Sequence, residues 1–265
     1  MVVSACRPPL SARARPSTAL RCGMFLAFGT LDQRQMAPTP VLQRQLVAPH
    51  SGRPADAHEL ANTAWTRAAA GLTASSDSAA IATESASRLR ELTPLELARL
   101  AWAIAAAGFP ARQLFGVISS EASRRSLRDF SPHELSLLAG ALARAEHTPG
   151  GLFHALACES TRQRSSFTPR DLATAMWAFA KAGYEVPALF DALAQVGAQG
   201  LRELGARQLA EVASALATVG DATPALFKLL ADVAVEMWAQ LDGNTRRVIR
   251  WAFDAAGHSQ MLHLA

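Results

Sequence analysis

A repeat of about 37 residues is the feature that most constrains how this chain of 265 residues can fold. The tryptophans show it first, because Trp65, Trp102, Trp177 and Trp251 are separated by one or two steps of about 37 residues. The six positions of this tryptophan slot are Trp65, Trp102, Gly140, Trp177, Ser214 and Trp251. A period between about 20 and 50 residues is typical of solenoids, in which each unit packs on its neighbours.

Each unit begins with a helix-start signature. The expected N-cap residues are Asp56, Thr93, Ser131, Thr168, Gly205 and Asp242, followed three positions later by Glu59, Glu96, Glu134, Asp171, Gln208 and Thr245. In most units this pair forms a capping box, in which two side chains satisfy backbone N–H groups at the helix start. We expect this first helix to run about 14 residues to a glycine six positions after the tryptophan slot, where Glu146 is an exception.

A second helix is expected after a turn that contains proline. Its start is marked by a Leu-Phe pair at 114–115, 152–153, 189–190 and 226–227. The first unit lacks this pair, and its second helix, within 73–87, is expected to be weak. Alanine abundance favours helix over sheet. The sequence therefore predicts an all-α fold, an α-solenoid of about six 37-residue helix-turn-helix repeats over residues 55–265.

Charge divides the chain into a basic head and a body of opposite sign. Residues 1–54 hold seven arginines and one acid, Asp32, which gives +6, so the remainder of a chain with a net charge of +4 is −2. An arginine-rich, serine-containing, acid-poor head is typical of an organellar transit peptide. We expect a disordered extension that directs import into the mitochondrial matrix, or alternatively into a plastid; an extension without a targeting role is the other interpretation. No apolar stretch is long enough to predict a membrane span.

Catalytic and metal-binding motifs are absent from the sequence. There is no phosphate-binding glycine loop, no zinc-protease helix motif and no nucleophile elbow. His154 and Cys158 have the spacing of two ligands on one helix, but two ligands without a third are expected to be an ordinary core pair. We therefore expect a protein that is not an enzyme and needs no metal or cofactor.

The segment from Phe167 to Gly183, Phe-Thr-Pro-Arg-Asp-Leu-Ala-Thr-Ala-Met-Trp-Ala-Phe-Ala-Lys-Ala-Gly, carries a family resemblance that Leu92 to Gly108 shares. It resembles the octotricopeptide repeats of protist organelle proteins. It is also similar to the leucine-rich region of FAST-kinase-like mitochondrial proteins and to the helical-repeat subunit of the kinetoplastid RNA-editing substrate-binding complex. The resemblance covers about residues 56–257. It implies organellar RNA binding, RNA processing or control of mRNA stability, with other ribonucleoprotein subunits as partners. Many such relatives carry a C-terminal RAP domain, for which too few residues follow Gly257, so no cleavage activity is expected.

A candidate RNA surface lies on the first helix of each unit. The positions seven before, three before and four after the tryptophan slot share one helix face. Its candidate RNA-binding residues are Arg99, Arg144, Arg170, Lys181, Arg207, His58, His133, Asn62 and Thr174. Across the units this face, here called the stripe, holds five cations and one anion, Glu211. Such a stripe could follow the phosphates of single-stranded RNA while its neutral polar side chains contact bases.

Two alternatives to an RNA surface remain open. The stripe could be an ordinary solvated helix face, since Leu95, Leu137 and Val248 also lie on it. A negatively charged body instead favours a protein-binding scaffold of the armadillo or HEAT type. The tryptophans themselves are expected to be core residues, because alanines flank them and leucines lie at helical spacing.

Overall fold

The computed structural model describes residues 56–69, 84–85, 87–107, 112–219 and 224–262. The predicted extension over 1–54 and most of the weak helix expected within 73–87 lie outside this range. The chain divides into two compact units, whose described parts are 56–152 and 153–262. The described residues form ten α-helices and several short 3₁₀ turns, and no β-strand occurs among them. None of these helices is both long enough and apolar enough to cross a membrane.

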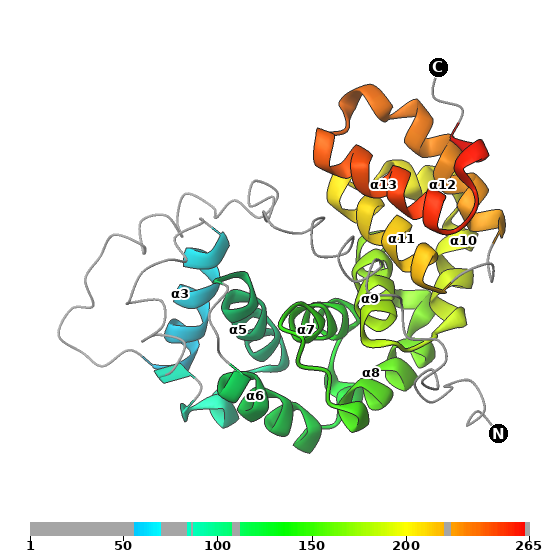
Figure 1. The fold of residues 1–265 in the computed structure, drawn as a ribbon. Coiled ribbons are helices and arrows are strands. Elements are labelled where there is room, and N and C mark those ends of the chain that lie inside the picture. The colour runs from blue at the N-terminus through cyan, green and yellow to red at the C-terminus, as the bar shows by residue number, and fades with distance from the viewer. Residues whose placement is uncertain (1–55, 70–83, 86, 108–111, 220–223, 263–265) are drawn as a thin grey trace, which may run out of the picture. The chain divides into compact units, whose positions relative to one another are not determined.

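The N-terminal unit contains three first helices and one second helix. They are α3 (Ala57–Ala69), α5 (Pro94–Ala107), α6 (Arg112–Arg124) and α7 (Pro132–Arg144). Helix α5 packs against α3 and α7, and α6 packs against α5 (Figure 1). Ala101 and Ala139 are fully buried in this packing, as expected for first helices that approach one another closely.

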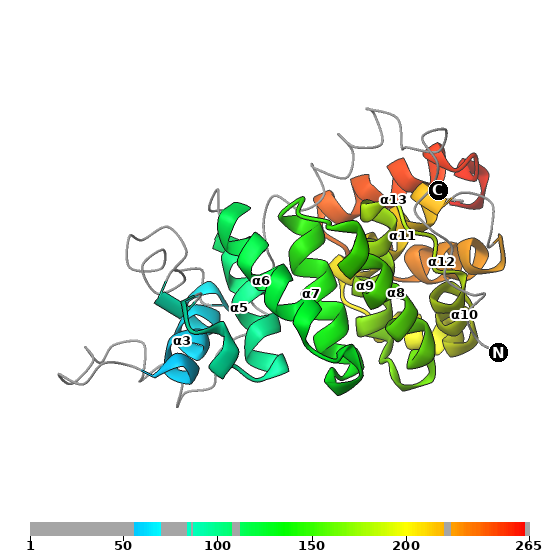
Figure 2. The same cartoon turned by 90° about the horizontal axis from the view of Figure 1, so that it is seen from below.

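The C-terminal unit repeats the same arrangement. Its helices are α8 (Gly150–Arg162), which starts at the boundary, α9 (Pro169–Ala182), α10 (Pro187–Arg202), α11 (Ala206–Val219), α12 (Pro224–Glu236) and α13 (Gly243–Ala255). Helix α11 packs against the neighbouring first helices α9 and α13, and α10 packs against α9 and α12 (Figures 1 and 2). From α5 to α13, first and second helices alternate along the described residues, and the predicted all-α fold of helix-turn-helix repeats is confirmed.

The predicted N-caps form as the sequence indicates. At Ser131 both halves of the capping box are present, because the hydroxyl accepts from the backbone N–H of Glu134 and the Glu134 carboxylate accepts from the backbone N–H of Ser131. Thr93 and Glu96 make the same two bonds at 2.8 and 3.3 Å. Each cap satisfies backbone donors that the helix itself leaves unpaired and stabilises the helix start by about 1 kcal/mol.

Four 3₁₀ turns lie just ahead of first helices and were not predicted. They are Leu89–Glu91, Leu127–Asp129, Arg164–Ser166 and Trp238–Gln240. After the first two, the backbone N–H groups of Leu92 and Phe130 donate to the carbonyls of Leu89 and Leu127. Both side chains that follow are buried, so each turn delivers the apolar residue before the cap into the core.

The C-terminal stop of the first helix is the same at Gly183, Gly257 and Glu146, although Glu146 is not a glycine. Gly183 has a φ of 78°, and the backbone N–H of Tyr184 donates to the carbonyl of Phe179 at 2.9 Å. Glu146, the exception in the glycine series, has a φ of 55°, and the N–H of His147 donates to the carbonyl of Leu142 at 3.0 Å. The fold therefore imposes the left-handed conformation even on a residue with a Cβ atom.

Replacing Glu146 with glycine is expected to stabilise the protein by about 1 kcal/mol, because glycine adopts a positive φ without the steric cost of a Cβ atom. The Glu146 side chain is exposed, and no polar contact of it is found among the described residues. Urea unfolding measures the change. Gly183→Ala, at the same position of the next unit, should lower stability by a similar amount. A Glu146→Gly protein less stable than the wild type would contradict this account.

Candidate nucleic-acid interface

The stripe runs along the first helices from end to end. Residues seven before the tryptophan slot lie in the first helical turn, and residues four after it lie in the last turn. The two ends are eleven residues apart, which corresponds to about 16 Å along the helix axis. The first-turn candidates are His58, His133, Arg170 and Arg207; the middle ones are Asn62, Arg99 and Thr174; the last-turn ones are Arg144 and Lys181.

The middle of the stripe is largely a contact between repeats. Leu137, Glu211 and Val248 are buried there, with Glu211 fully inaccessible. In the C-terminal unit, Thr174 on α9 donates its hydroxyl to the Glu211 carboxylate on α11 at 3.1 Å. Arg207 donates its Nε to the same carboxylate at 3.0 Å. The single anion of the stripe is therefore buried between two first helices and compensated by side chains from both.

Two other cations of the stripe lie on the tryptophans. The Arg99 guanidinium is 5.4 Å from the centre of the Trp65 ring, and the Lys181 ammonium is 5.4 Å from the centre of the Trp177 ring. Trp65 also stacks at a tilt on Trp102, with ring centres 4.7 Å apart. Cations at this distance over an indole ring are attracted to its electron-rich face. The tryptophans thus hold the cationic side chains against the helix surface.

The expectation that tryptophans are core residues holds fully for two of the four. Trp102 and Trp177 are buried, at 5% and 1% exposure. Trp65 and Trp251 are half-buried, because each belongs to a first helix near an end of its unit. A half-buried indole still contributes most of its area to packing.

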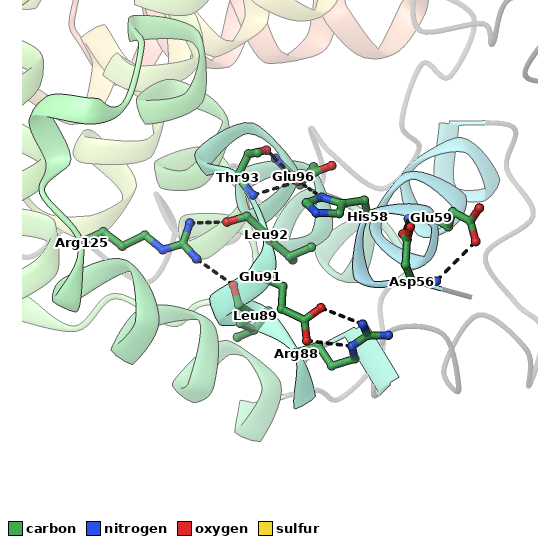
Figure 3. A network of polar contacts seen from close by, with 10 residues as sticks. All are labelled: Asp56, His58, Glu59, Arg88, Leu89, Glu91, Leu92, Thr93, Glu96 and Arg125. Carbon is green, nitrogen blue, oxygen red and sulfur yellow. Dashed lines mark hydrogen bonds and ion pairs between the residues drawn. The ribbon is translucent and has the colours of Figure 1, made fainter. Parts of the chain in front are cut away.

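His58 is tied to the next repeat through a capping box (Figure 3). Its Nδ1 lies 2.8 Å from the Glu96 carboxylate, which also accepts from the backbone N–H and hydroxyl of Thr93. The hydrogen bond to Glu96, with the charge of that carboxylate, raises the pKa of His58. Burial pushes the pKa of Glu96 up, but the bonds from Thr93 and His58 outweigh it, and the net shift is downward.

The raised pKa of His58 predicts a pH dependence of stability. The folded state holds the proton more tightly than the unfolded chain, so the pair contributes fully below about pH 6.5, the ordinary histidine value, and loses its contribution as pH rises through the folded pKa. Urea unfolding at pH 5.5 and pH 8 should show a smaller difference in free energy for His58→Gln than for the wild type. His154→Gln is the matched control. An unchanged difference in His58→Gln would exclude this role.

Among the candidates, the structure brings Arg170, Thr174 and Arg207 together within the C-terminal unit. They lie on α9 and α11, which pack side by side. Arg170 is exposed, and no polar contact of its guanidinium is found in the described residues. His58, Asn62 and Arg99 are brought together in the same way on α3 and α5 of the N-terminal unit. His133 and Arg144 lie at opposite ends of α7.

His154 and Cys158 lie on one face of α8, with Nε2 and Sγ 3.7 Å apart. The expectation of a core pair is wrong, because the His154 side chain is exposed and Cys158 is half-buried. No group of three or more potential metal ligands occurs within the described part of the chain.

A family model described as RNA-editing substrate-binding complex 6 protein matches residues 56–256, a range that includes every described first helix from α3 to α13. The chain belongs to this family. No curated protein gives a significant match. Of the three resemblances that the repeat sequence carries, the family match concerns the RNA-editing substrate-binding complex; the octotricopeptide and FAST-kinase-like relationships stay predictions.

In this member of the RNA-editing substrate-binding complex 6 family, sequence reasoning missed arginines that clamp the 3₁₀ turns. Arg125, directly after α6, donates to the carbonyls of Leu89 and Leu92 at 2.7 Å each (Figure 3). Arg246 on α13 donates to the carbonyls of Trp238 and Ala239 at 2.9 and 3.1 Å. Backbone carbonyls are the same at every residue, so the amino-acid pattern gives no signal from which these two contacts could have been predicted.

Proposed function

We propose that the protein is a non-catalytic subunit of a mitochondrial RNA-editing substrate-binding complex that binds single-stranded RNA and acts in RNA processing or mRNA stability. The observation that carries this proposal is the family match over residues 56–256. Other ribonucleoprotein subunits are its expected partners. The repeats are of the octotricopeptide-like kind in this proposal, with one base contacted per unit.

The cations of the stripe in the C-terminal unit support an RNA contact. Arg170 and Arg207 lie in the first turns of two adjacent helices, and Lys181 lies in the last turn of the same helix as Arg170. Glu211 neutralises Arg207. We therefore assign the phosphate contacts of this unit to the exposed Arg170 and to Lys181, whose ammonium would exchange the Trp177 ring for a phosphate. Removing a phosphate contact weakens binding and reduces its dependence on salt.

The double variant Arg170→Ala, Lys181→Ala is expected to lower the slope of log affinity against log salt by about 1.4, since each cation at a single strand contributes about 0.7. Fluorescence anisotropy of the full chain with a labelled oligouridylate, from low to high KCl, measures it. Arg90→Ala, Arg128→Ala is the matched control, because both side chains are exposed and lie on 3₁₀ turns outside the stripe. Equal slopes for the stripe variant and the wild type would remove the stripe from the interface.

A protein-binding scaffold of the armadillo or HEAT type is the second candidate function. It is favoured by the contacts of Arg99 with Trp65 and of Arg207 with Glu211. Cationic side chains that already make contacts within the fold bind the phosphates of RNA less strongly. A wild-type protein with no affinity for single-stranded RNA at low salt would favour this function over RNA binding.

We further propose that residues 1–54 direct import into the mitochondrial matrix, with the plastid as the alternative destination, and that residues 55–265 form the functional repeat domain. The +6 charge of the head supports this proposal. A fluorescent protein fused to residues 1–54 should enter mitochondria, and a fusion that stays in the cytosol would refute it.

A further inference from the structure

The last first helix carries a basic cluster that lies outside the predicted stripe candidates. Arg246, Arg247 and Arg250 all lie on α13, next to the 3₁₀ turn that holds Trp238. The guanidiniums of Arg246 and Arg250 lie 5.8 and 5.2 Å from the centre of the Trp238 ring. Arg247 and Arg250 are exposed, and Trp238 is half-buried. We call these four residues the α13 cluster.

No carboxylate neutralises the α13 cluster within the described residues. The nearest acids in the sequence have other partners: Asp242 caps the helix at the N–H groups of Asn244 and Thr245, and Asp254 accepts from the Ser259 hydroxyl at 2.7 Å. Elsewhere in the described parts, arginines at the surface often pair with acids, as in Arg88–Glu91, Arg162–Glu159 and Arg202–Glu236. The end of a repeat array must be polar to stay soluble, and side chains of mixed charge are enough for that. Solubility alone therefore does not explain three cations of the same sign on one helix.

The three arginines differ in how firmly they are held. Arg246 is fixed by two hydrogen bonds to the carbonyls of Trp238 and Ala239, so it positions the turn. Arg247 makes one bond, to the Asn244 side chain at 3.1 Å. Arg250 makes no hydrogen bond among the described residues, and its guanidinium lies over the indole ring of Trp238. Arg247 and Arg250 are three residues apart, so both guanidiniums lie on the same side of α13.

We propose that the α13 cluster is an anchor for single-stranded RNA, in which Arg247 and Arg250 bind successive phosphates and a base stacks on Trp238. This inference rests on the proposed function and assigns it a second site. An aromatic face beside unpaired cations is the combination by which proteins hold single strands without reading their sequence. The guanidinium of Arg250 turns from the ring to a phosphate, and the base takes its place on the indole.

The test is anisotropy of the full chain with a labelled oligouridylate of about 12 nucleotides, across KCl concentration. Arg247→Ala, Arg250→Ala should lower the salt slope by about 1.4, and Arg247→Lys, Arg250→Lys should keep it. Trp238→Leu should weaken binding about five- to hundredfold with the slope unchanged, because stacking carries no charge, and Trp238→Phe should retain most of the affinity. Arg90→Ala, Arg128→Ala again controls for net charge, and thermal melting confirms that each variant is folded.

The outcomes separate this inference from the proposed function. A wild-type chain that does not bind the oligouridylate overturns both. If Arg170→Ala, Lys181→Ala lowers the slope and Arg247→Ala, Arg250→Ala does not, RNA binding stands and the anchor is refuted. If a labelled peptide of glutamates binds as tightly as RNA, loses affinity in Arg247→Ala, Arg250→Ala and keeps it in Trp238→Leu, the cluster is a site for an acidic protein segment instead.

Discussion

Replacing Arg207 with alanine is expected to lower the free energy of unfolding by about 3–5 kcal/mol, because it leaves the carboxylate of Glu211 buried without its cation. The Thr174 hydroxyl still donates to that carboxylate, but one neutral hydrogen bond does not replace a charge. The corresponding fall in melting temperature is about 10 °C. Circular dichroism during heating and urea unfolding both measure it.

The control for Arg207→Ala is a double variant that removes the charges of Arg207 and Glu211 together. Arg207→Leu, Glu211→Leu should cost much less than Arg207→Ala, since apolar replacement of a buried ion pair is often neutral. A single variant as stable as the wild type would show that the buried contact contributes nothing. The large expected effect also matters for RNA experiments, because weak binding by Arg207→Ala reports partial unfolding and says little about phosphates.

Replacing Trp177 with alanine is expected to cost about 3–5 kcal/mol, because it empties the largest fully buried side-chain site among the described residues. Lys181 also loses the ring beneath its ammonium group. Trp177→Phe fills most of the site and should recover more than half of the loss. Trp251→Ala, at the same repeat position but half-buried, should cost less than Trp177→Ala. Urea unfolding of the three variants gives the comparison.

A different result for Trp177 would change the interpretation of the tryptophan slot. If Trp177→Ala melted like the wild type and lost RNA affinity, the ring would be a stacking surface for bases and not a core residue. The 1% exposure of Trp177 argues for the core, since a base needs an open ring face.

Local chemistry explains why the repeat fold could be predicted from the sequence. The capping boxes at Thr93 and Ser131 and the apolar residues Leu92 and Phe130 before them act within one helix start, and their meaning depends little on the rest of the chain. The first helices are accordingly 13 or 14 residues long, as the glycine spacing predicts. The left-handed conformation at Glu146 shows the limit of this logic, because there the fold overrides the residue type.

The site was harder to predict because a helix face does not reveal what covers it. Arg99, Thr174 and Glu211 occupy the same repeat position, yet Thr174 and Glu211 meet across two helices and Glu211 is fully buried. Their polar character alone predicts that all three side chains face solvent. Contacts one repeat apart in the sequence, such as Thr174 with Glu211 and His58 with Glu96, appear only when neighbouring helices are placed side by side.

The clamp made by Arg125 has a consequence for how proteins of this kind can change length. Its guanidinium donates to carbonyls 33 and 36 residues earlier in the chain, at the start of its own repeat. These hydrogen bonds hold the two ends of the repeat at a fixed distance from each other. Adding or deleting one residue within α6 would rotate Arg125 by about 100° about the helix axis and take its guanidinium away from these carbonyls. Duplication or loss of a complete module leaves such a closure intact. Engineers who wish to lengthen this array should therefore copy whole repeats.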